Sequence, residues 1–306
     1  MRRSIIIGDV MFDIIANMRG EPFPGSDQIA DISFKIGGSG ANQAVWLSHL
    51  GNHCDFHGCV FRDDHDVITK HFNSYGVIAN LQQATEPTGK VICLLEKKGE
   101  RSFITDRGAN NLLNIKSMSE RYLDNFEHLH ISGHLLYEER IYLDLIDLIK
   151  KFKRQKSMGL ITMDVGSASF IRDSGVNRFI DVSRLCDLIF LNSDEFIELN
   201  KFFNREAKKR CTSLGITIVK NGAKGAYCLD FDGKIIAQND ALSVKIEDTI
   251  GAGDAFFAGF MSKYLYEKDI NIALDSGAKM GSICCGIQGS VPRTDQYRMQ
   301  LKRDDW

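Results

Sequence analysis

The sequence has no run of about 18 apolar residues, so we expect no helix that crosses a membrane. The first apolar run, Ile5–Ile7, is short and is followed at once by Gly8 and Asp9, so we interpret it as a first strand rather than a signal segment. An excess of positive charge is also absent, since the formal net charge is −2. We therefore expect neither a nucleic acid nor a membrane as a partner.

Cysteine patterns typical of metal binding are missing as well. The chain has 8 cysteines, but none of them forms a C-x-x-C pair. Most lie in apolar stretches, where a free cysteine packs as a small hydrophobic residue. The sequence therefore predicts reduced thiols, no zinc site and a cytoplasmic protein.

Two common nucleotide-binding motifs are absent. The glycine-rich stretch 37–40 lacks the G-x-G-x-x-G spacing of dinucleotide-binding folds, which excludes a Rossmann oxidoreductase. Gly89 and Lys90 look like the end of a Walker A loop, but Ala84 stands where the first glycine of that loop is required. A nucleotide would therefore need another binding device.

Apolar runs alternate with helical patterns along the chain. Strands are expected at 4–10, 129–131, 160–164, 188–191 and 216–219. Helices are expected at 138–153, 175–184, 194–201, 205–214, 252–266 and near 271–286. This alternation predicts parallel β-α-β units, with helices packed around a sheet. No linker or repeat interrupts the pattern, so we expect one α/β domain over 1–306.

Other stretches predict antiparallel strands. Residues 29–36 alternate apolar and polar side chains, as a half-exposed strand does. Residues 91–95 and 101–105 are expected to form a hairpin around a turn at 97–100. A second hairpin is expected from 227–229 and 235–237, which are separated by Asp232-Gly233.

Polar residues follow several of the expected parallel strands. They are Asp9, Asp164, Asn192, Glu195 and Lys220. Each of them alone is typical of a helix cap or a turn. Because the carboxyl ends of parallel strands meet at one edge of a sheet, their repeated placement predicts a ligand site there.

A loop of small residues opens the helix predicted at 252–266. Gly251, Ala252 and Gly253 can bring their N–H groups close to an anion, and the helix dipole favours negative charge at the same place. Asp254 follows in the first turn, where it could position and deprotonate a hydroxyl for phosphoryl transfer. The alternative is that Asp254 only complements the dipole. Under either interpretation we expect the dipole to lower the pKa of Asp254, which would make it a weaker base.

Three stretches together resemble the ribokinase-like (PfkB) family of carbohydrate and nucleoside kinases. Residues 248–256 are similar to the signature D-T-x-G-A-G-D-x-F, residues 37–44 to G-G-x-x-x-N-x-A, and residues 192–195 to N-x-x-E. The resemblance implies a three-layer α/β sandwich with a mostly parallel central sheet. It also implies a small lid of β-strands, inserted from about 12–36 and 88–107, through which family members often form homodimers.

The resemblance also implies a function and a set of site residues. The activity would be transfer of the γ-phosphate of MgATP to a hydroxyl, expected to be primary, of a small-molecule sugar. Asp254 would be the base, and the amides of Gly251, Ala252 and Gly253 the anion hole. The residues implied to bind the sugar are Asp13, Gly37, Gly38 and Asn42. The residues implied on the ATP side are Asn192, Glu195, Lys220, Gly222 and Gly225, with Glu195 near Mg²⁺ through water.

Two further roles leave alternatives open. Asp248, together with Ile250, matches the family position for a monovalent cation such as K⁺, or Asp248 merely caps a turn. Arg107 ends a lid strand and could contact a substrate carboxylate or the transferred phosphoryl group. Alternatively, Arg107 is a surface residue paired with Asp106 or Glu100.

The sequence departs from the family at one place. Many members carry an Asn and an Arg shortly after the aspartate that corresponds to Asp164, whereas here Val165, Gly166 and Ser167 follow. The remaining alternatives are a nucleoside kinase of the same family and a catalytically silent sugar or nucleotide sensor. The presence of both the 251–253 loop and Asp254 argues against a sensor, because a sensor needs neither.

Overall fold

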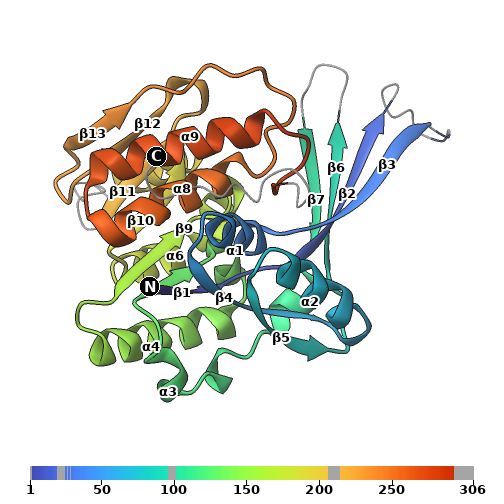
Figure 1. The fold of residues 1–306 in the computed structure, drawn as a ribbon, viewed down its shortest axis with the longest axis horizontal. Helices are drawn as coiled ribbons and strands as arrows, with labels where there is room; N and C mark the ends of the chain where they lie inside the picture. Colours follow the sequence, from blue (N-terminus) through green and yellow to red (C-terminus); the bar gives the residue numbers. More distant parts are fainter. Residues whose placement is uncertain are drawn as a thin grey trace.

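The central sheet of the computed structural model has nine strands among the described residues, which are 2–18, 25, 27, 29–95, 101–205 and 214–292. Their order is β13-β12-β11-β10-β9-β8-β1-β4-β5 (Figure 1). Six neighbouring pairs are parallel, while β12 pairs antiparallel with both β11 and β13. The bounds are β1 (Arg3–Ile7), β4 (His53–Phe61), β5 (Ile78–Ala84), β8 (His128–Ile131), β9 (Leu160–Asp164), β10 (Leu188–Asn192), β11 (Ile216–Lys220), β12 (Ala226–Leu229) and β13 (Ile235–Asn239).

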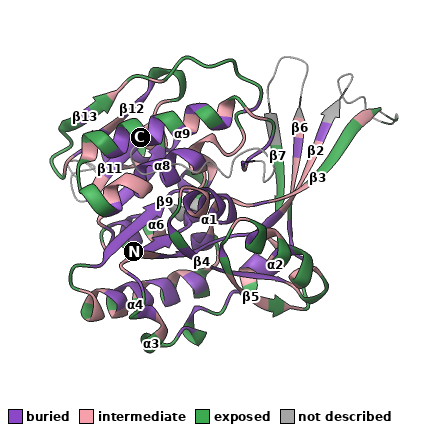
Figure 2. Ribbon diagram, viewed as in Figure 1, coloured by how far each residue is buried: buried purple, intermediate pink, exposed green. Residues whose placement is uncertain are grey.

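Helices cover both faces of this sheet. The helices are α1 (Ser39–His49), α2 (His65–Ser74), α3 (Glu120–Leu123), α4 (Glu139–Gln155), α5 (Ala168–Phe170), α6 (Val176–Ser183), α7 (Ser193–Arg205), α8 (Ala252–Glu267) and α9 (Ile270–Cys285). Successive side chains of a strand point to opposite faces, and so Ile6 packs in one core cluster while Ile5 and Ile7 pack in the other. Helices α1, α2, α8 and α9 contribute to the cluster of Ile6, and α3, α4, α6 and α7 to the other. The sheet is therefore the middle layer of a three-layer sandwich, and Figure 2 shows its inner strands, such as β1 and β9, largely buried.

A second sheet of four strands forms the lid. Its order is β3-β2-β6-β7, with bounds β2 (Met11–Met18), β3 (Ala30–Gly37), β6 (Gly89–Leu95) and β7 (Arg101–Asp106). β2 follows β1 after three residues, so the lid is rooted at the carboxyl edge of the central sheet and projects away from it (Figure 1). The expected three-layer fold, its mostly parallel sheet and its lid are confirmed. The turn at 97–100 and residues 206–213 of a predicted helix lie outside the described residues.

One region of the fold was not predicted from the sequence. β4, α2 and β5 lie between the glycine-rich stretch 37–40 and the hairpin of β6 and β7. No apolar periodicity in their residues predicted these three elements. β4 carries Asp55 inside the protein, where the carboxylate accepts hydrogen bonds from Arg3 Nη2 at 3.1 Å and from Tyr122 Oη at 2.7 Å. Such pairing allows a polar residue in a buried strand. Within the described ranges, none of the helices is long and apolar enough to cross a membrane.

Candidate active site

The loop before α8 brings backbone close to the site. Gly251 adopts φ 79°, and a Cβ at this position would lie 2.5 Å from the carbonyl oxygen of Ser290, so only glycine fits. The helix that follows is buried from Ala255 to Met261, which fixes the loop against the core. Of the three amides expected to form an anion hole, that of Ala252 donates a long hydrogen bond of 3.4 Å to Thr249 O. The loop is placed as expected, at the start of α8.

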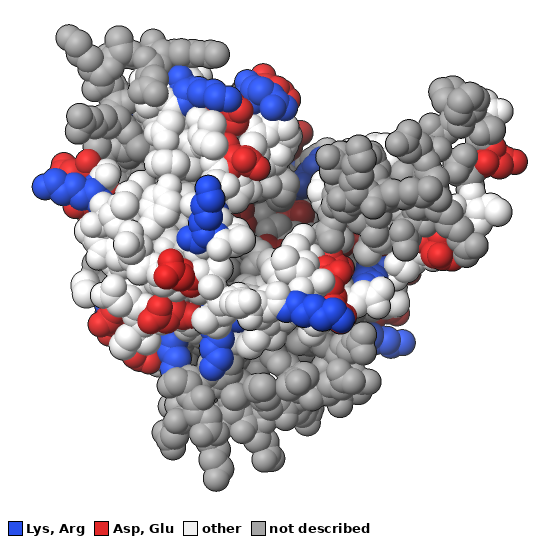
Figure 3. All heavy atoms as spheres, turned by 90° about the horizontal axis from the view of Figure 1, so that it is seen from above, with Lys and Arg blue, Asp and Glu red and all other residues white. Residues whose placement is uncertain are grey.

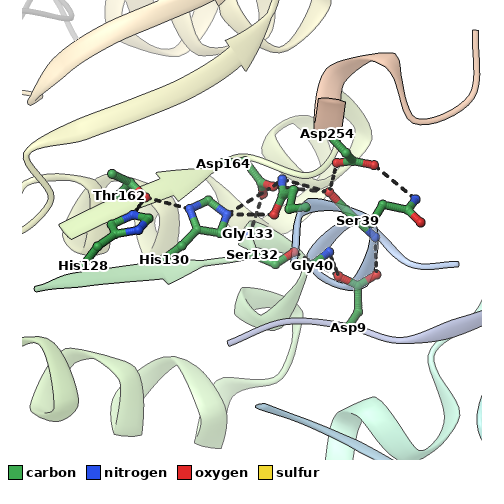
Figure 4. A network of polar contacts seen from close by, with 12 residues as sticks. Asp9, Ser39, Gly40, His128, His130, Ser132, Gly133, Thr162, Asp164 and Asp254 are labelled. Atoms are coloured by element: carbon green, nitrogen blue, oxygen red, sulfur yellow. Dashed lines mark hydrogen bonds and ion pairs between the residues drawn. The ribbon is translucent and has the colours of Figure 1, made fainter. Parts of the chain in front are cut away.

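Asp254 is held by two side chains of α1. Ser39 Oγ donates to Oδ1 at 2.7 Å, and Asn42 Nδ2 donates to Oδ2 at 3.2 Å (Figure 4). Burial raises the pKa of Asp254 to about 7, the bond from Ser39 opposes that rise, and the charge of Asp164 adds to it. The expectation of a dipole-lowered pKa was therefore wrong, because the loss of hydration outweighs the helix terminus. A carboxyl group of this kind is well matched to base catalysis near neutral pH.

Asp164 lies behind Asp254 and is satisfied by several donors. The Gly133 N–H donates to Oδ1 at 2.8 Å, the Gln43 amide donates to Oδ2, and Ser39 Oγ lies 3.3 Å from Oδ2. Burial alone would raise its pKa, but these donors and the nearby His130 ring hold the pKa below its ordinary value. Figure 4 shows Ser39 between the two carboxylates. One hydroxyl therefore links an aspartate that stays ionised to one that titrates near neutrality.

Asp9 supports the start of α1. Its carboxylate accepts hydrogen bonds from the N–H groups of Ser39 and Gly40, both at 3.3 Å, and from Ser132 Oγ at 2.9 Å. Burial acts to raise its pKa, but the charges of His134 and Arg107 and these hydrogen bonds outweigh burial and lower it. The anionic side chain thus stabilises the helix terminus that presents Ser39 to the site.

A cavity of about 720 Å³ lies between the lid and the body. Figure 3 shows the surface hollowed there, with acidic and basic side chains inside the hollow. Asp13, Gly38, Asn42, Arg107 and Asp254 all line it, although they come from distant parts of the sequence. Gly37 lies directly against the Asp13 carboxylate, where a Cβ would collide with it. The structure therefore gathers all the residues expected to bind the sugar beside the expected base.

Two of these residues have an unusual environment. Burial raises the pKa of Asp13 to about 7, the charge of Asp9 adds to this rise, and Lys35 opposes it. The Arg107 side chain is 15 % exposed, and its Nη1 lies 3.9 Å from Asp9 Oδ2. Its Cζ lies 5.8 Å from the centroid of the Tyr137 ring, and its buried Nε has no hydrogen-bond partner within the described chain. With 15 % of its side chain exposed, Arg107 is therefore not the exposed surface residue of the alternative interpretation. Asp106 accepts a hydrogen bond from the Gly108 N–H, and Glu100 lies outside the described residues.

The residues expected on the ATP side form a second group at the same sheet edge. Asn192 and Glu195 cap α7 reciprocally: Glu195 Oε2 accepts from Asn192 N at 2.7 Å, and Asn192 Oδ1 accepts from Glu195 N at 2.9 Å. Burial raises the pKa of Glu195 to about 7, against the opposing charge of Lys220. A Cβ added at Gly253 would lie 3.1 Å from Lys220 Nζ, so this ammonium group lies at the anion loop.

The two glycines expected beside ATP differ from each other. Gly222 has φ 55° and open space around its Cα. Gly225 has φ 82°, and its Cα is pressed against the backbone of Asn239 and Asp240. Both the positive φ and the packing of Gly225 thus require that it has no side chain, whereas Gly222 leaves room for a ligand.

Asp248 connects the loop before α8 to a later segment. Its Oδ1 accepts from Ile250 N at 3.0 Å and its Oδ2 from Gly289 N at 3.1 Å. Ile250 O accepts a contact from Cys284 Sγ at 3.4 Å. The capping role of Asp248 is therefore present in the structure, and a cation at Asp248 and Ile250 stays a prediction.

Several residues of the site were missed by sequence reasoning. Ser39, His134 and Tyr137 line the cavity. Behind them, His130 Nε2 lies 2.8 Å from Gln43 Oε1, and the Gln43 amide in turn contacts Asp164. Ser39 lies inside the glycine motif at a position that any residue can fill, and the histidines lie in or just after a short strand. Only their proximity to Asp254 and Asp164 marks them, and sequence alone does not reveal it.

Together the glycine loop, the buried carboxylate and the covered polar cavity define a phosphotransferase site for a small polar molecule. The family model described as pfkB family carbohydrate kinase matches residues 1–295, so the chain belongs to this family of carbohydrate kinases. A ribokinase from Arabidopsis thaliana is 27 % identical, over 97 % of this chain and 80 % of that protein.

Solved structures share the fold. Ribokinase from Thermotoga maritima aligns with a TM-score of 0.79 and 23 % identity, over 96 % of this chain and 97 % of that one. A putative ribokinase II from E. coli, in complex with ATP and Mg²⁺, aligns with a TM-score of 0.80 and 21 % identity, over 95 % of this chain and 94 % of that one.

Proposed function

We propose that this protein transfers the γ-phosphate of MgATP to a hydroxyl of a sugar, with Asp254 as the base. We expect this hydroxyl to be a primary one. The observation that carries the proposal is the position of the Asp254 carboxylate. It lies in the sugar cavity, at the first turn after the Gly251–Gly253 loop, and is oriented by Ser39 and Asn42. With a pKa of about 7, this carboxylate can accept a proton from a bound hydroxyl and release it again at neutral pH.

The surrounding residues would divide the remaining work. Asp13 and Asn42 would bind sugar hydroxyls, Gly38 would border the sugar, and Gly37 leaves the space that the Asp13 carboxylate occupies. The amides of the 251–253 loop and the Lys220 ammonium would stabilise negative charge that develops during transfer. Arg107 would contact the transferred phosphoryl group from the lid side. Its unpaired Nε–H supports this role, because a buried donor without a partner is costly unless a ligand supplies one.

The nucleotide and its metal ions would lie on the Lys220 side of the loop. ATP with Mg²⁺ supplies the phosphoryl group and neutralises its charge. Asn192 and Glu195 have the oxygen donors that Mg²⁺ prefers, and they would hold it through water. Lys220, Gly222 and Gly225 would border the nucleotide, and Asp248 with Ile250 would hold a K⁺ ion that fixes the loop. The E. coli structure holds ATP and Mg²⁺ on the same fold, which supports MgATP as the phosphoryl donor.

An assay of ADP release tests the proposal. Wild-type protein would be supplied with MgATP and a panel of pentoses, hexoses, sugar acids and nucleosides. At least one compound should give turnover, and Asp254→Asn should lower kcat on it by about 10²–10⁴-fold while MgATP binding survives. Asp232→Asn, on an exposed turn, is the matched control and should match wild type. Wild-type turnover by Asp254→Asn would refute the assignment of the base.

We further propose that two copies of this chain associate through the outer face of the lid. One register row across all four strands of that face is apolar: Phe34, Ile14, Ile92 and Ile104. Phe34 is 71 % exposed and Ile104 59 % exposed, which is costly for a surface that stays in water. Sedimentation should give a dimer for wild type, a monomer for Ile104→Asp, and a dimer for Ile235→Asp, which alters a similarly exposed isoleucine on β13. A wild-type monomer at all concentrations would contradict the proposal.

A further inference from the structure

A row of buried polar side chains crosses the central sheet on the face that α1 and α8 cover. Ser4 lies on β1, His128 and His130 lie on β8, and Thr162 lies on β9, and each of the four is 0 % exposed. Strand pairing aligns them, because Ser4 is a register partner of His128, and Thr162 of His130. The Phe257 ring of α8 packs on the His130 ring, with 4.0 Å between the two ring centroids. Buried polar groups of this kind are costly unless each has a hydrogen-bond partner.

Hydrogen bonds join these four side chains. Ser4 Oγ lies 2.9 Å from His128 Nδ1, and His128 Nε2 lies 2.8 Å from Thr162 Oγ1. On its other side, Thr162 Oγ1 lies 2.7 Å from His130 Nδ1. The Thr162 hydroxyl therefore links the two histidine rings, as Figure 4 shows.

Gln43 of α1 continues this chain to the carboxylates of the site. His130 Nε2 lies 2.8 Å from Gln43 Oε1. Gln43 Nε2 contacts Asp164 Oδ2 and lies 3.2 Å from Ser39 Oγ. Ser39 Oγ in turn donates to Asp254 Oδ1 at 2.7 Å. A continuous line of polar contacts thus runs from β1 to the expected base.

The ionised carboxylate of Asp164 determines which atoms of the chain donate. An ionised carboxylate only accepts, so the nitrogen of the Gln43 amide faces Asp164, and its oxygen faces His130. An amide oxygen also only accepts, so His130 Nε2 carries a proton. In a neutral imidazole the other nitrogen is then an acceptor, and Thr162 donates its hydroxyl proton to His130 Nδ1.

The same reasoning fixes the other histidine. Thr162 has one hydroxyl proton and gives it to His130, so its oxygen accepts from His128 Nε2–H. His128 Nδ1 then accepts from the Ser4 hydroxyl. Burial lowers the pKa of both histidines, which keeps the two rings neutral. All donors of the chain therefore point toward the carboxylates.

Gln43 decides where the Ser39 proton points. Ser39 Oγ lies near two carboxylates, 2.7 Å from Asp254 Oδ1 and 3.3 Å from Asp164 Oδ2. The Gln43 amide donates to that same Asp164 oxygen and to Ser39 Oγ. Because this Asp164 oxygen already has a donor, the Ser39 hydroxyl proton goes to Asp254.

We propose that His130 is a positioning residue, which fixes the Gln43 amide and thereby directs the Ser39 hydroxyl proton to the base. This inference rests on the proposed kinase function and adds a residue to its mechanism. Without the His130 donor, Gln43 Oε1 has no hydrogen-bond partner within the described chain, and the amide is free to turn. Asp164 would then lose a donor and compete with Asp254 for the Ser39 proton.

Two substitutions separate the Nε2–H of His130 from its ring. His130→Gln keeps an N–H group that reaches Gln43, whereas His130→Leu removes it. We would measure kcat/KM for the preferred substrate by ADP release from pH 5.5 to 9.5. In His130→Leu the fall in kcat/KM at acid pH should begin about half a pH unit higher, because the bond from Ser39 to Asp254 is weakened but not lost. His130→Gln should keep the wild-type profile.

The matched control is His57→Leu, since His57 is another buried histidine of the sheet and its Nε2 lies 3.0 Å from Tyr122 Oη. It should keep the wild-type profile. Adding His130→Leu to Ser39→Ala should cause no further shift, because His130 acts through Ser39. Besides those that line the cavity, the titratable groups that face Asp254 and His130 and stay in place in all these variants are His128, Asp164, Lys220 and Cys284. Equal losses of activity in both His130 variants with an unmoved acid limb, or a further shift in the double variant, would overturn the proposal.

Nitrogen-15 NMR of the wild-type protein tests the chain without turnover. The shifts of the two ring nitrogens distinguish the neutral tautomers of a histidine. His128 and His130, assigned by the loss of each signal in His128→Gln and His130→Gln, should both carry the proton on Nε2 from pH 5.5 to 9.5. A proton on Nδ1 of His130 would overturn the proposal.

Carbon-13 NMR separates this proposal from the kinase function. The pKa of the Asp254 carboxyl group, assigned with Asp254→Asn, should be about half a unit higher in His130→Leu than in wild type. If this shift appears while no compound is phosphorylated, the positioning by His130 stands and the kinase function alone fails. An unchanged pKa would overturn the positioning role and leave the kinase function intact.

Discussion

Replacing Ser39 with alanine should move the acid limb of the pH–rate profile to higher pH. Asp254 acts as a base only when it is ionised, so wild-type kcat/KM should fall as the pH drops below about 7. Ser39 Oγ donates to Asp254 at 2.7 Å and stabilises the ionised form. Without that donor the pKa of Asp254 rises further, and the fall in kcat/KM begins at a higher pH.

The size of the shift follows from the hydrogen bond. A bond to a charged group contributes about 1.5–3 kcal/mol, and about 1.4 kcal/mol corresponds to one pKa unit. Water that enters the space of the lost hydroxyl replaces part of this stabilisation, so we expect the pKa of Asp254 to rise by about one unit. With a pKa near 8 in place of 7, the ionised fraction at pH 7 falls by about fivefold. At pH 9 the two enzymes should differ little.

The assay is kcat/KM for the preferred substrate, measured by ADP release from pH 5.5 to 9.5. Ser48→Ala is the control, because it removes a hydroxyl from the same helix, where Ser48 Oγ donates to Tyr75 O far from Asp254. It should keep the wild-type profile. An unchanged acid limb in Ser39→Ala, or one displaced to lower pH, would refute the assignment of Asp254 as the titrating base.

Three further outcomes are expected. Asp254→Asn should raise the unfolding temperature by about 2 °C at pH 8 and by less at pH 5. The reason is that a carboxyl group with a raised pKa in the folded state destabilises the protein increasingly as the pH rises from about 4 to 7. Asp232→Asn should show no such gain in the same thermal scans. Arg107→Ala should lower kcat more than it raises KM if Arg107 contacts the transferred phosphoryl group, and wild-type kinetics would dismiss any functional role. K⁺ should accelerate turnover relative to tetramethylammonium if a cation fixes the loop at Asp248, and identical rates would leave Asp248 as a cap alone.

The sequence predicted those parts of the fold that depend on local patterns. Buried parallel strands such as 188–191 are continuous apolar runs, and the glycine loop at 251–253 requires backbone conformations that leave a visible signature. β4 escaped prediction because its polar residues are satisfied by partners far away in the sequence. Asp55 is paired with Arg3 and Tyr122, and nothing near Asp55 in the chain reveals either partner.

The same limit applies to the electrostatics of the site. The position of Asp254 at a helix start is a local fact, and it predicts a lowered pKa. Its burial beneath α1 and its proximity to Asp164 are tertiary facts, and they reverse the direction. The link through Ser39 joins residues 39, 164 and 254, which only the packing of α1 against α8 and β9 brings together.

The departure after Asp164 now has a structural context. Gly166 has φ 84° and packs against His134, while Ser167 and Ser169 line the cavity, so small groups stand where many family members have an Asn and an Arg. A cation that balances the transferred charge must then come from elsewhere. Lys220 at the 251–253 loop and Arg107 on the lid are the basic side chains that the described residues place on the two sides of Asp254. Arg107 directly follows β7, and its Nη1 lies 3.9 Å from Asp9 Oδ2, so this guanidinium stands at the root of the lid, against the body.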